Sequence, residues 1–165
     1  MHIYKNKMYA LIVSAMILFL VTACAEMAEM DSHSSISRFQ KSENVFRASM
    51  RWGEWENVYQ LLKPNPDNPS SKLKSPSEEY LNYLSTIKVA HIEVIKSGIT
   101  AEDKAGESLF LIEYRFENSA KIRRIRHTVY WWYNEEANTW FSDTPLPEVF
   151  AMPKSKTIKL SPKSN

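Results

Sequence analysis

The sequence contains few of the residues that catalytic and metal-binding motifs require. It has one cysteine and three glycines among 165 residues, so it forms no internal disulfide and has no glycine-rich phosphate loop. Neither CxxC nor HExxH occurs, and zinc therefore lacks its usual ligands. We expect no cofactor and no metal, and no catalytic motif is evident from the sequence alone.

Beyond its first 23 residues the chain has no excess of basic over acidic residues. Two of the 21 lysine and arginine residues, Lys5 and Lys7, lie in the first 23 residues, which contain no acidic residue. The remainder carries 19 basic and 19 acidic side chains, so the charge does not indicate a nucleic-acid partner. The length and the 44% hydrophobic content are sufficient for one sizeable core, and we expect a single domain.

The N-terminus has the pattern of an export signal. Lys5 and Lys7 precede an apolar run of 14 residues, Met8 to Val21, and the small residues Thr22 and Ala23 follow it. A positive segment, a short apolar segment and small residues at the cleavage site are typical of a secretory signal peptide.

The four residues Val21-Thr22-Ala23-Cys24 resemble the lipobox of bacterial lipoproteins, in which a branched apolar residue and two small residues precede an obligatory cysteine. The resemblance implies cleavage after Ala23, a diacylglyceryl group on the Cys24 sulfur and acylation of the new amino group. Several acyl chains anchor a protein firmly, whereas one binds only marginally. Because Ala25, and not aspartate, follows the cysteine, the resemblance favours the outer membrane, with the domain facing the periplasm.

An uncleaved transmembrane helix is the alternative for this segment. Met8 to Ala25 is a stretch of 18 residues without a charge, which is close to the shortest length that spans a bilayer. The positive residues before it place the rest of the chain outside the cytoplasm in either case. The predicted organisation is a signal peptide at 1–23, a lipidated tether at 24–37, one domain at 38–150 and a flexible tail at 151–165.

Apolar residues at helical spacing predict three helices. They are expected over residues 38–52, 54–62 and 77–84. Gly53 separates the first two and forms an elbow between them. Prolines exclude a helix over 63–76, and Ser75 or Ser77 is the expected N-cap of the third helix.

After Thr86 the pattern changes to the two-residue period of β-strands. Strands are expected over residues 87–96, 108–117, 121–134 and 139–143. The alternation slips near Ala90, which indicates a β-bulge, and it is regular from Phe110 onward. The proline-containing segment 143–150 is expected to cover a sheet edge.

Helices followed by sequential strands predict an α+β fold, with N-terminal helices packed on a curved antiparallel sheet of three to four strands. The segments RWGEWENVYQLLKP (51–64) and YWWYNEEANTWFSD (130–143) look like the helical elbow and the terminal hairpin of the nuclear transport factor 2-like, cystatin-like cone. The resemblance spans residues 36–150 and implies helices in the concave side of the sheet. Members of this family range from enzymes to pure binders, so the fold leaves the function open.

Two histidines of the expected domain are candidates for acid–base chemistry. His127 lies on an apolar strand face and His91 lies on another strand, and Asp143 or Glu113 would supply the carboxylate. This arrangement resembles that of polyketide-cyclase-like enzymes and defines a cyclase or isomerase hypothesis. The alternative is a histidine at the edge of the core. A pocket of a few hundred Å³ in which His127 and an acid converge would favour the enzyme.

The other face of the strand over 121–134 is basic and aromatic, which is typical of a docking surface or of a solvated face. We expect a noncatalytic domain that binds a protein partner or an apolar ligand in the envelope. The expected contact residues are Tyr114, Arg124, Arg126, Tyr130, Trp132 and Trp140. The identity of the partner and the oligomeric state stay open.

Overall fold

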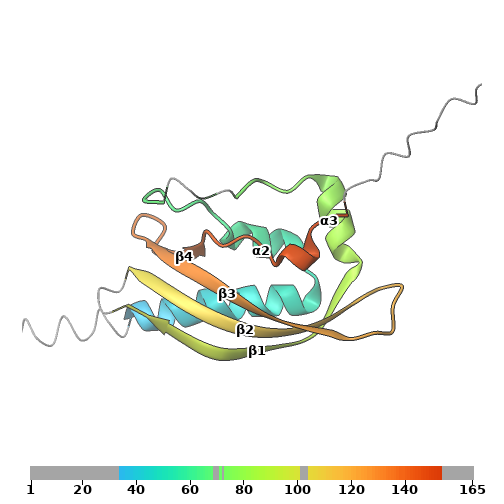
Figure 1. The fold of residues 1–165 in the computed structure, drawn as a ribbon. Helices are drawn as coiled ribbons and strands as arrows, with labels where there is room; N and C mark the ends of the chain where they lie inside the picture. Colours follow the sequence, from blue (N-terminus) through green and yellow to red (C-terminus); the bar gives the residue numbers. More distant parts are fainter. Residues whose placement is uncertain (1–33, 69–70, 72, 101–103, 154–165) are drawn as a thin grey trace, which may run out of the picture.

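The computed structural model describes residues 34–68, 71, 73–100 and 104–153. Residues 34–52 are helical and are called the first helix here; α2 (Trp55–Leu61) and α3 (Glu78–Ser85) follow it. The strands are β1 (Ile87–Ile99), β2 (Ala105–Phe116), β3 (Arg123–Asn134) and β4 (Thr139–Ser142), followed by the short 3₁₀-helix η1 (Glu148–Phe150). The helices pack on the sheet (Figure 1), and the predicted α+β fold is confirmed.

The sheet is an antiparallel meander with the strand order β1-β2-β3-β4. The register of β1 against β2 shifts between Val89 and His91, which confirms the predicted bulge at Ala90, and shifts again between Val94 and Lys96. The β1–β2 hairpin extends further than predicted, because the polar ends of both strands pair up to the contact of Ile99 with Gly106. Backbone pairing therefore continues beyond the apolar alternation that marks the strands in the sequence.

The helices begin and end close to the predicted positions, with one difference. Residues 34–37, which we assigned to the tether, are already helical, and Ser35 is buried. Gly53 has a φ of 74°, a conformation that glycine adopts readily, and it forms the expected elbow. The Ser77 side chain accepts a hydrogen bond from the Tyr80 backbone N–H at 3.2 Å and is the N-cap of α3.

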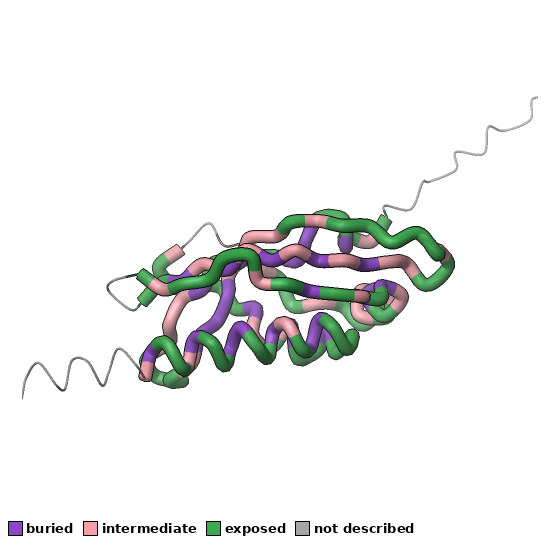
Figure 2. Tube along the Cα trace, turned by 90° about the horizontal axis from the view of Figure 1, so that it is seen from below, coloured by how far each residue is buried: buried purple, intermediate pink, exposed green. Residues whose placement is uncertain are grey.

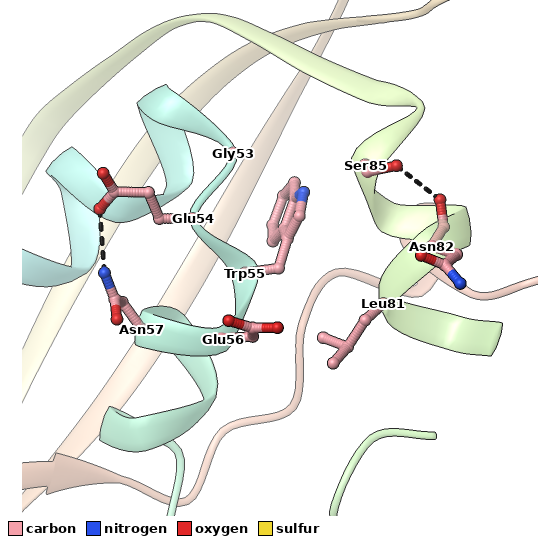
Figure 3. A pocket seen from close by; sticks show the side chains of 8 residues that line it. All are labelled: Gly53, Glu54, Trp55, Glu56, Asn57, Leu81, Asn82 and Ser85. Atoms are coloured by element: carbon pink, nitrogen blue, oxygen red, sulfur yellow. Dashed lines mark hydrogen bonds between the residues drawn. The ribbon is translucent and has the colours of Figure 1, made fainter. Parts of the chain in front are cut away.

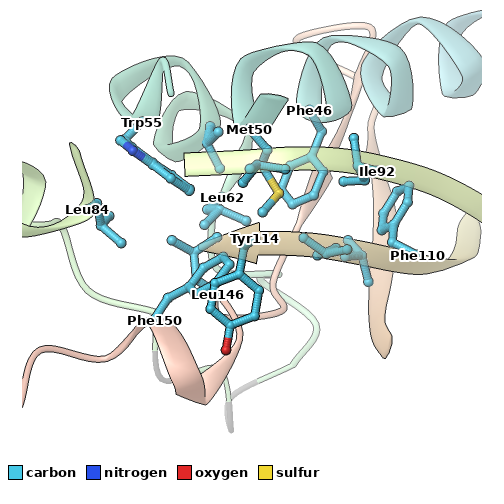
Figure 4. Packing of buried hydrophobic residues seen from close by; sticks show 14 of the residues in the cluster. Phe46, Met50, Trp55, Leu62, Leu84, Ile92, Phe110, Tyr114, Leu146 and Phe150 are labelled. Atoms are coloured by element: carbon cyan, nitrogen blue, oxygen red, sulfur yellow. The ribbon is translucent and has the colours of Figure 1, made fainter. Parts of the chain in front are cut away.

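An aromatic core occupies the space between the helices and the inner face of the sheet (Figure 4). The Phe46 ring stacks on Phe110 with centroids 5.7 Å apart. Phe39 makes edge contacts with Trp131 at 6.0 Å and Trp140 at 5.3 Å. Buried residues recur along the first helix (Figure 2), because its apolar stripe faces this core.

The segment over 143–150 does more than cover a sheet edge. Phe150 is fully buried, and its ring makes edge contacts with Trp55 at 6.0 Å and Tyr114 at 5.0 Å. At the same time the Thr144 hydroxyl accepts a hydrogen bond from the Tyr130 backbone N–H at 2.8 Å. The segment therefore continues past the short strand β4 and closes the core at the end where α2 and α3 lie.

One buried chain of hydrogen bonds joins the first helix to the sheet. The Ser108 hydroxyl donates to Glu43 Oε1 at 2.6 Å and accepts from Trp131 Nε1 at 2.9 Å. Ser108 is 0% exposed and Glu43 is 6% exposed. Buried polar groups persist when they are paired in this way, so the three side chains hold the helix, β2 and β3 in one arrangement.

Two glycines on neighbouring strands give a matched test of the packing at the hairpin end. A Cβ on Gly106 would lie 2.8 Å from Phe39 Cε2, whereas a Cβ on Gly98 would meet nothing within 4 Å. Because aromatic rings hold Phe39 in place, Gly106→Ala should lower the free energy of unfolding by about 1–3 kcal/mol. Gly98→Ala should leave it unchanged or raise it by about 0.5 kcal/mol. Urea denaturation measures both values, and equal effects of the two substitutions would contradict this packing.

Candidate functional site

Core side chains fill the inner face of the sheet, where the enzyme hypothesis requires a pocket. Phe110, Val129 and Trp131 are each at most 2% exposed. Tyr114 and Trp140, two of the predicted contact residues, are 2% and 0% exposed and belong to this core. Both therefore lie outside the surface that a partner can reach.

His127 lies on the inner face of β3, opposite Phe110 of β2. Its Nε2 atom is buried and has no hydrogen-bond partner among the described residues. Because the charged imidazolium loses water there, burial lowers the pKa of His127 from its ordinary 6.5 to about 4. At neutral pH the imidazole is uncharged and packs at the side of the core.

The other members of the predicted acid–base set do not approach His127. His91 is exposed and pairs with Glu113 on the outer face of the sheet, opposite to the face that carries His127. Glu113 Oε1 accepts from Arg124 Nε at 2.8 Å and lies 2.6 Å from its Nη2. Asp143 Oδ2 accepts from Asn68 Nδ2 at 2.7 Å. Among the described residues no carboxylate is placed beside His127, and the one pair of the predicted set that lies together, His91 with Glu113, is on the outer face of the sheet, where Arg124 binds the carboxylate. The pocket that would favour the enzyme hypothesis is therefore not found among these residues.

The outer face of the sheet carries three of the predicted contact residues on β3. Arg124 and Arg126 are exposed, and Tyr130 has 56% of its surface exposed. Arg124 is engaged in the ion pair with Glu113, and Arg126 lies opposite Leu111 of β2. This surface combines a cationic side chain, an aromatic ring and half-buried apolar residues, which is the composition of many protein interfaces.

Trp132 marks the end of that surface. Its Nε1 donates to the Lys63 carbonyl at 3.1 Å, and its ring lies 5.5 Å from that of Phe141. The Lys63 ammonium sits 4.2 Å from the centroid of the Phe141 ring. The chain after α2 therefore holds Trp132 in place at the β4 side of the sheet.

The structure also shows hollows that the sequence did not predict. Two adjoining hollows, of about 190 and 420 Å³, lie between the first helix and β1 and share Arg51 in their walls. Arg47 and Arg51 line them from the helix, and Lys88 and His91 from the strand. The only sign of these hollows in the sequence is a pair of arginines four residues apart, followed by Trp52. They lie on a helix whose prediction rests on its apolar stripe and not on its charged residues.

A third hollow, of about 410 Å³, lies at the elbow (Figure 3). Glu54, Glu56 and Asn82 are among its lining residues. Glu54 Oε2 accepts from Asn57 Nδ2 at 3.0 Å, and the Trp55 indole N–H in its wall has no partner among the described residues. Its carboxylates give this hollow a negative charge, opposite to that of the two hollows between the first helix and β1.

Within the part of the chain that the structure describes, no group of three or more histidine, cysteine, aspartate or glutamate residues could hold a metal ion. No helix of that part is long and apolar enough to cross a membrane. The signal peptide, Cys24, most of the tether and the tail after residue 153 lie outside the described residues. No match to the chain was found among protein-family models, curated proteins or solved structures.

The burial of His127 predicts a specific pH dependence of stability. The unfolded chain binds a proton at His127 near pH 6.5, whereas the folded chain binds it only near pH 4. Stability is therefore unaffected by this group above about pH 6.5 and falls as the pH drops from 6.5 toward 4, by up to roughly 3 kcal/mol.

His127→Phe should remove that loss, because phenylalanine does not titrate. Denaturant unfolding between pH 4 and 7 gives the free energy of unfolding at each pH, and its slope against pH is compared between this variant and the wild type. The same slope in His127→Phe as in the wild type would show that the folded state does not exclude the charged imidazole.

Proposed function

We propose that the chain is a bacterial envelope lipoprotein, anchored through acyl chains on Cys24, whose domain binds a protein partner without catalysing a reaction. The sequence Val21-Thr22-Ala23-Cys24 after a short apolar run supports the anchor. Nine residues lie between Cys24 and Ser34, where the described helix is already formed. A chain of that length reaches at most about 35 Å, so the domain stays close to the lipid surface.

The fold supports binding at the surface over catalysis or uptake of an apolar ligand. The described α+β fold is compatible with the cone that the sequence resembles, and we assign the domain to the nuclear transport factor 2-like, cystatin-like type. In members with an internal site the ligand needs space between helices and sheet. Here aromatic side chains occupy that space, which favours a partner on the outside.

The observation that carries the proposal is the exposed outer face of the sheet, on which Tyr130 is 56% exposed and Arg126 lies on the same face of β3, about 13 Å along the strand. Large aromatic side chains and arginine dominate the binding energy of protein interfaces, because they bury much surface at a low cost in conformational entropy. Tyr130 and Arg126 are the proposed central contacts, and Arg124 and Trp132 flank them.

Cys24→Ser should abolish labelling of the protein by a fatty acid and leave a longer, unprocessed chain, because serine cannot form the thioether. Metabolic labelling and intact mass measure both effects. Ala25→Asp is the matched variant: it should keep the label and move the protein to the inner-membrane fraction. Undiminished label and an unchanged mass in Cys24→Ser would exclude the lipoprotein anchor.

A photo-crosslinking residue in place of Tyr130 should capture one envelope protein in living cells, and the same residue in place of Glu56, which is exposed on α2, should not. Arg126→Glu should weaken the crosslink at position 130 at least tenfold, because it reverses a charge within the same proposed interface. Immunoblotting and mass spectrometry measure the yield. Equal yields at positions 130 and 56 would contradict a partner on the outer face.

A further inference from the structure

Two adjoining hollows lie between the first helix and β1 and share Arg51, whose side chain crosses from the helix to the Val89 carbonyl between them. We call the two together the basic groove and define it by Arg47, Arg51, Trp52, Lys88 and His91. It lies at the end of the first helix that leads to the elbow. The proposed partner surface is centred on Tyr130 and Arg126 of β3, two strands away from β1, and the two surfaces approach each other only at His91, which lies opposite the Arg124 partner Glu113. An inference about the groove therefore depends neither on that surface nor on the lipid anchor.

The lining of the groove has an excess of positive charge, whereas Glu54 and Glu56 line the neighbouring hollow at the elbow, which shares Gly53 and Ser85 with it. No acidic side chain lines either hollow of the groove. No ion pair with a carboxylate is formed by Arg47, Arg51 or Lys88 within the described part of the chain, whereas Arg124 and Lys104 each have one. The hydrogen-bond partners of these cations are neutral: Arg47 donates to the Asn44 side chain and Lys88 to the Ser85 carbonyl. Such a surface complements a ligand that carries carboxylates.

The spacing of the arginines suits an extended peptide. Arg47 and Arg51 are four residues apart on a helix, which places them about 6 Å apart along its axis. Carboxylates two residues apart on an extended chain are about 6.6 Å apart and point to the same side. Residues 44–52 of the helix wall cover about 12 Å, which corresponds to about four extended residues.

Arg51 and Trp52 show how such a peptide would be held. Arg51 Nη1 donates to the Val89 carbonyl at 2.9 Å, which fixes the guanidinium at the edge of β1 and leaves its other N–H groups available. Trp52 is 75% exposed, and the Arg51 guanidinium lies 5.7 Å from its ring centroid. An exposed tryptophan beside an arginine offers an apolar contact next to a charged one.

The position of β1 favours a peptide over a lipid surface. β1 is the end strand of the sheet and pairs only with β2 among the described strands, so a chain in the groove would run along a sheet edge, a common mode of peptide recognition. The cations line a concave surface from two sides, the helix and the strand. A planar layer of lipid headgroups would instead require them on a flat or convex surface.

We propose that the basic groove binds an extended acidic peptide segment of another protein, with carboxylates two residues apart on Arg47 and Arg51 and an apolar side chain against Trp52. Lys88 and His91 face the same segment from β1. The recognised chemistry is an alternation of acidic and apolar residues.

The test uses the full chain, purified from the membrane in detergent, and a labelled eight-residue peptide, acetylated and amidated, with Glu-Leu-Glu-Leu at its centre. Fluorescence anisotropy should give a Kd on the order of 10 μM at low salt, weaker by at least tenfold at high salt. The same peptide with Gln in place of Glu should bind at least tenfold more weakly.

The double variant Arg47→Glu, Lys88→Glu should lose at least tenfold in affinity, and Trp52→Ala about threefold or more. Lys41→Glu is the matched control, because Lys41 is exposed on the same helix and lines neither hollow; its affinity should stay within twofold of the wild type. Urea denaturation confirms that each variant is folded, and Arg47→Gln replaces the double variant if that one is not.

Three outcomes would overturn the proposal. The first is no binding of the Glu peptide, and the second is equal binding of the Glu and Gln peptides or an equal loss in Lys41→Glu. The third is the absence of peptide binding together with co-sedimentation on phosphatidylglycerol vesicles that Arg47→Glu, Lys88→Glu abolishes, which would assign the groove to anionic lipid. None of these outcomes bears on the lipid label of Cys24 or on the crosslink at position 130.

Discussion

The hydrogen-bonded chain from Trp131 through Ser108 to Glu43 is the constraint on which the arrangement of the helices depends. A buried carboxylate is costly unless it is paired, and the hydroxyl that pairs with it is itself oriented by an indole on the next strand. Because side chains alternate along a strand, a shift of β2 by one residue would turn Ser108 to the solvent and leave Glu43 without its partner. The chain therefore selects both the register of the sheet and the depth at which the first helix lies over it.

Once the helix is held at that depth, the aromatic rings fill the concave side of the sheet. Accessible charged and aromatic side chains then lie at the border of the domain and on its outer face. His127 illustrates the consequence: its imidazole lies on the face where a cone-fold enzyme would place one, yet it meets core side chains and stays uncharged. The basic side chains of Arg47, Arg51 and Lys88, with no acidic residue in the same lining, lie at the border between the first helix and β1, and the exposed aromatic ring of β3 lies on the outer face. The interior gives this domain its shape, and the border and the outer face are the surfaces at which we propose that other molecules bind.

The sequence predicted the features that depend on neighbouring residues. Gly53 at the elbow, Ser77 at the start of α3 and the bulge at Ala90 each have a local physical cause. Periodicity also placed Tyr114 on one face with Phe110 and Ile112, but it gave no measure of how deeply that face is covered, and Tyr114 is a core residue. The basic groove could not be predicted, because it joins residues 47 and 51 to residues 88 and 91 through helix-on-sheet packing that no local pattern encodes.

The length of the first helix relates the groove to the proposed anchor. Arg51 is 17 residues from Ser34, about 25 Å along the helix, while the nine residues between Cys24 and Ser34 let the tether reach at most about 35 Å. In the proposed arrangement the domain is confined to a layer beside the membrane, with the groove at the end of the helix away from the tether. Confinement raises the effective concentration of any partner held in the same layer. A groove that holds only about four residues of peptide, with an affinity too low for a freely diffusing partner, is then sufficient, and its specificity rests on the spacing of two arginines and not on buried area.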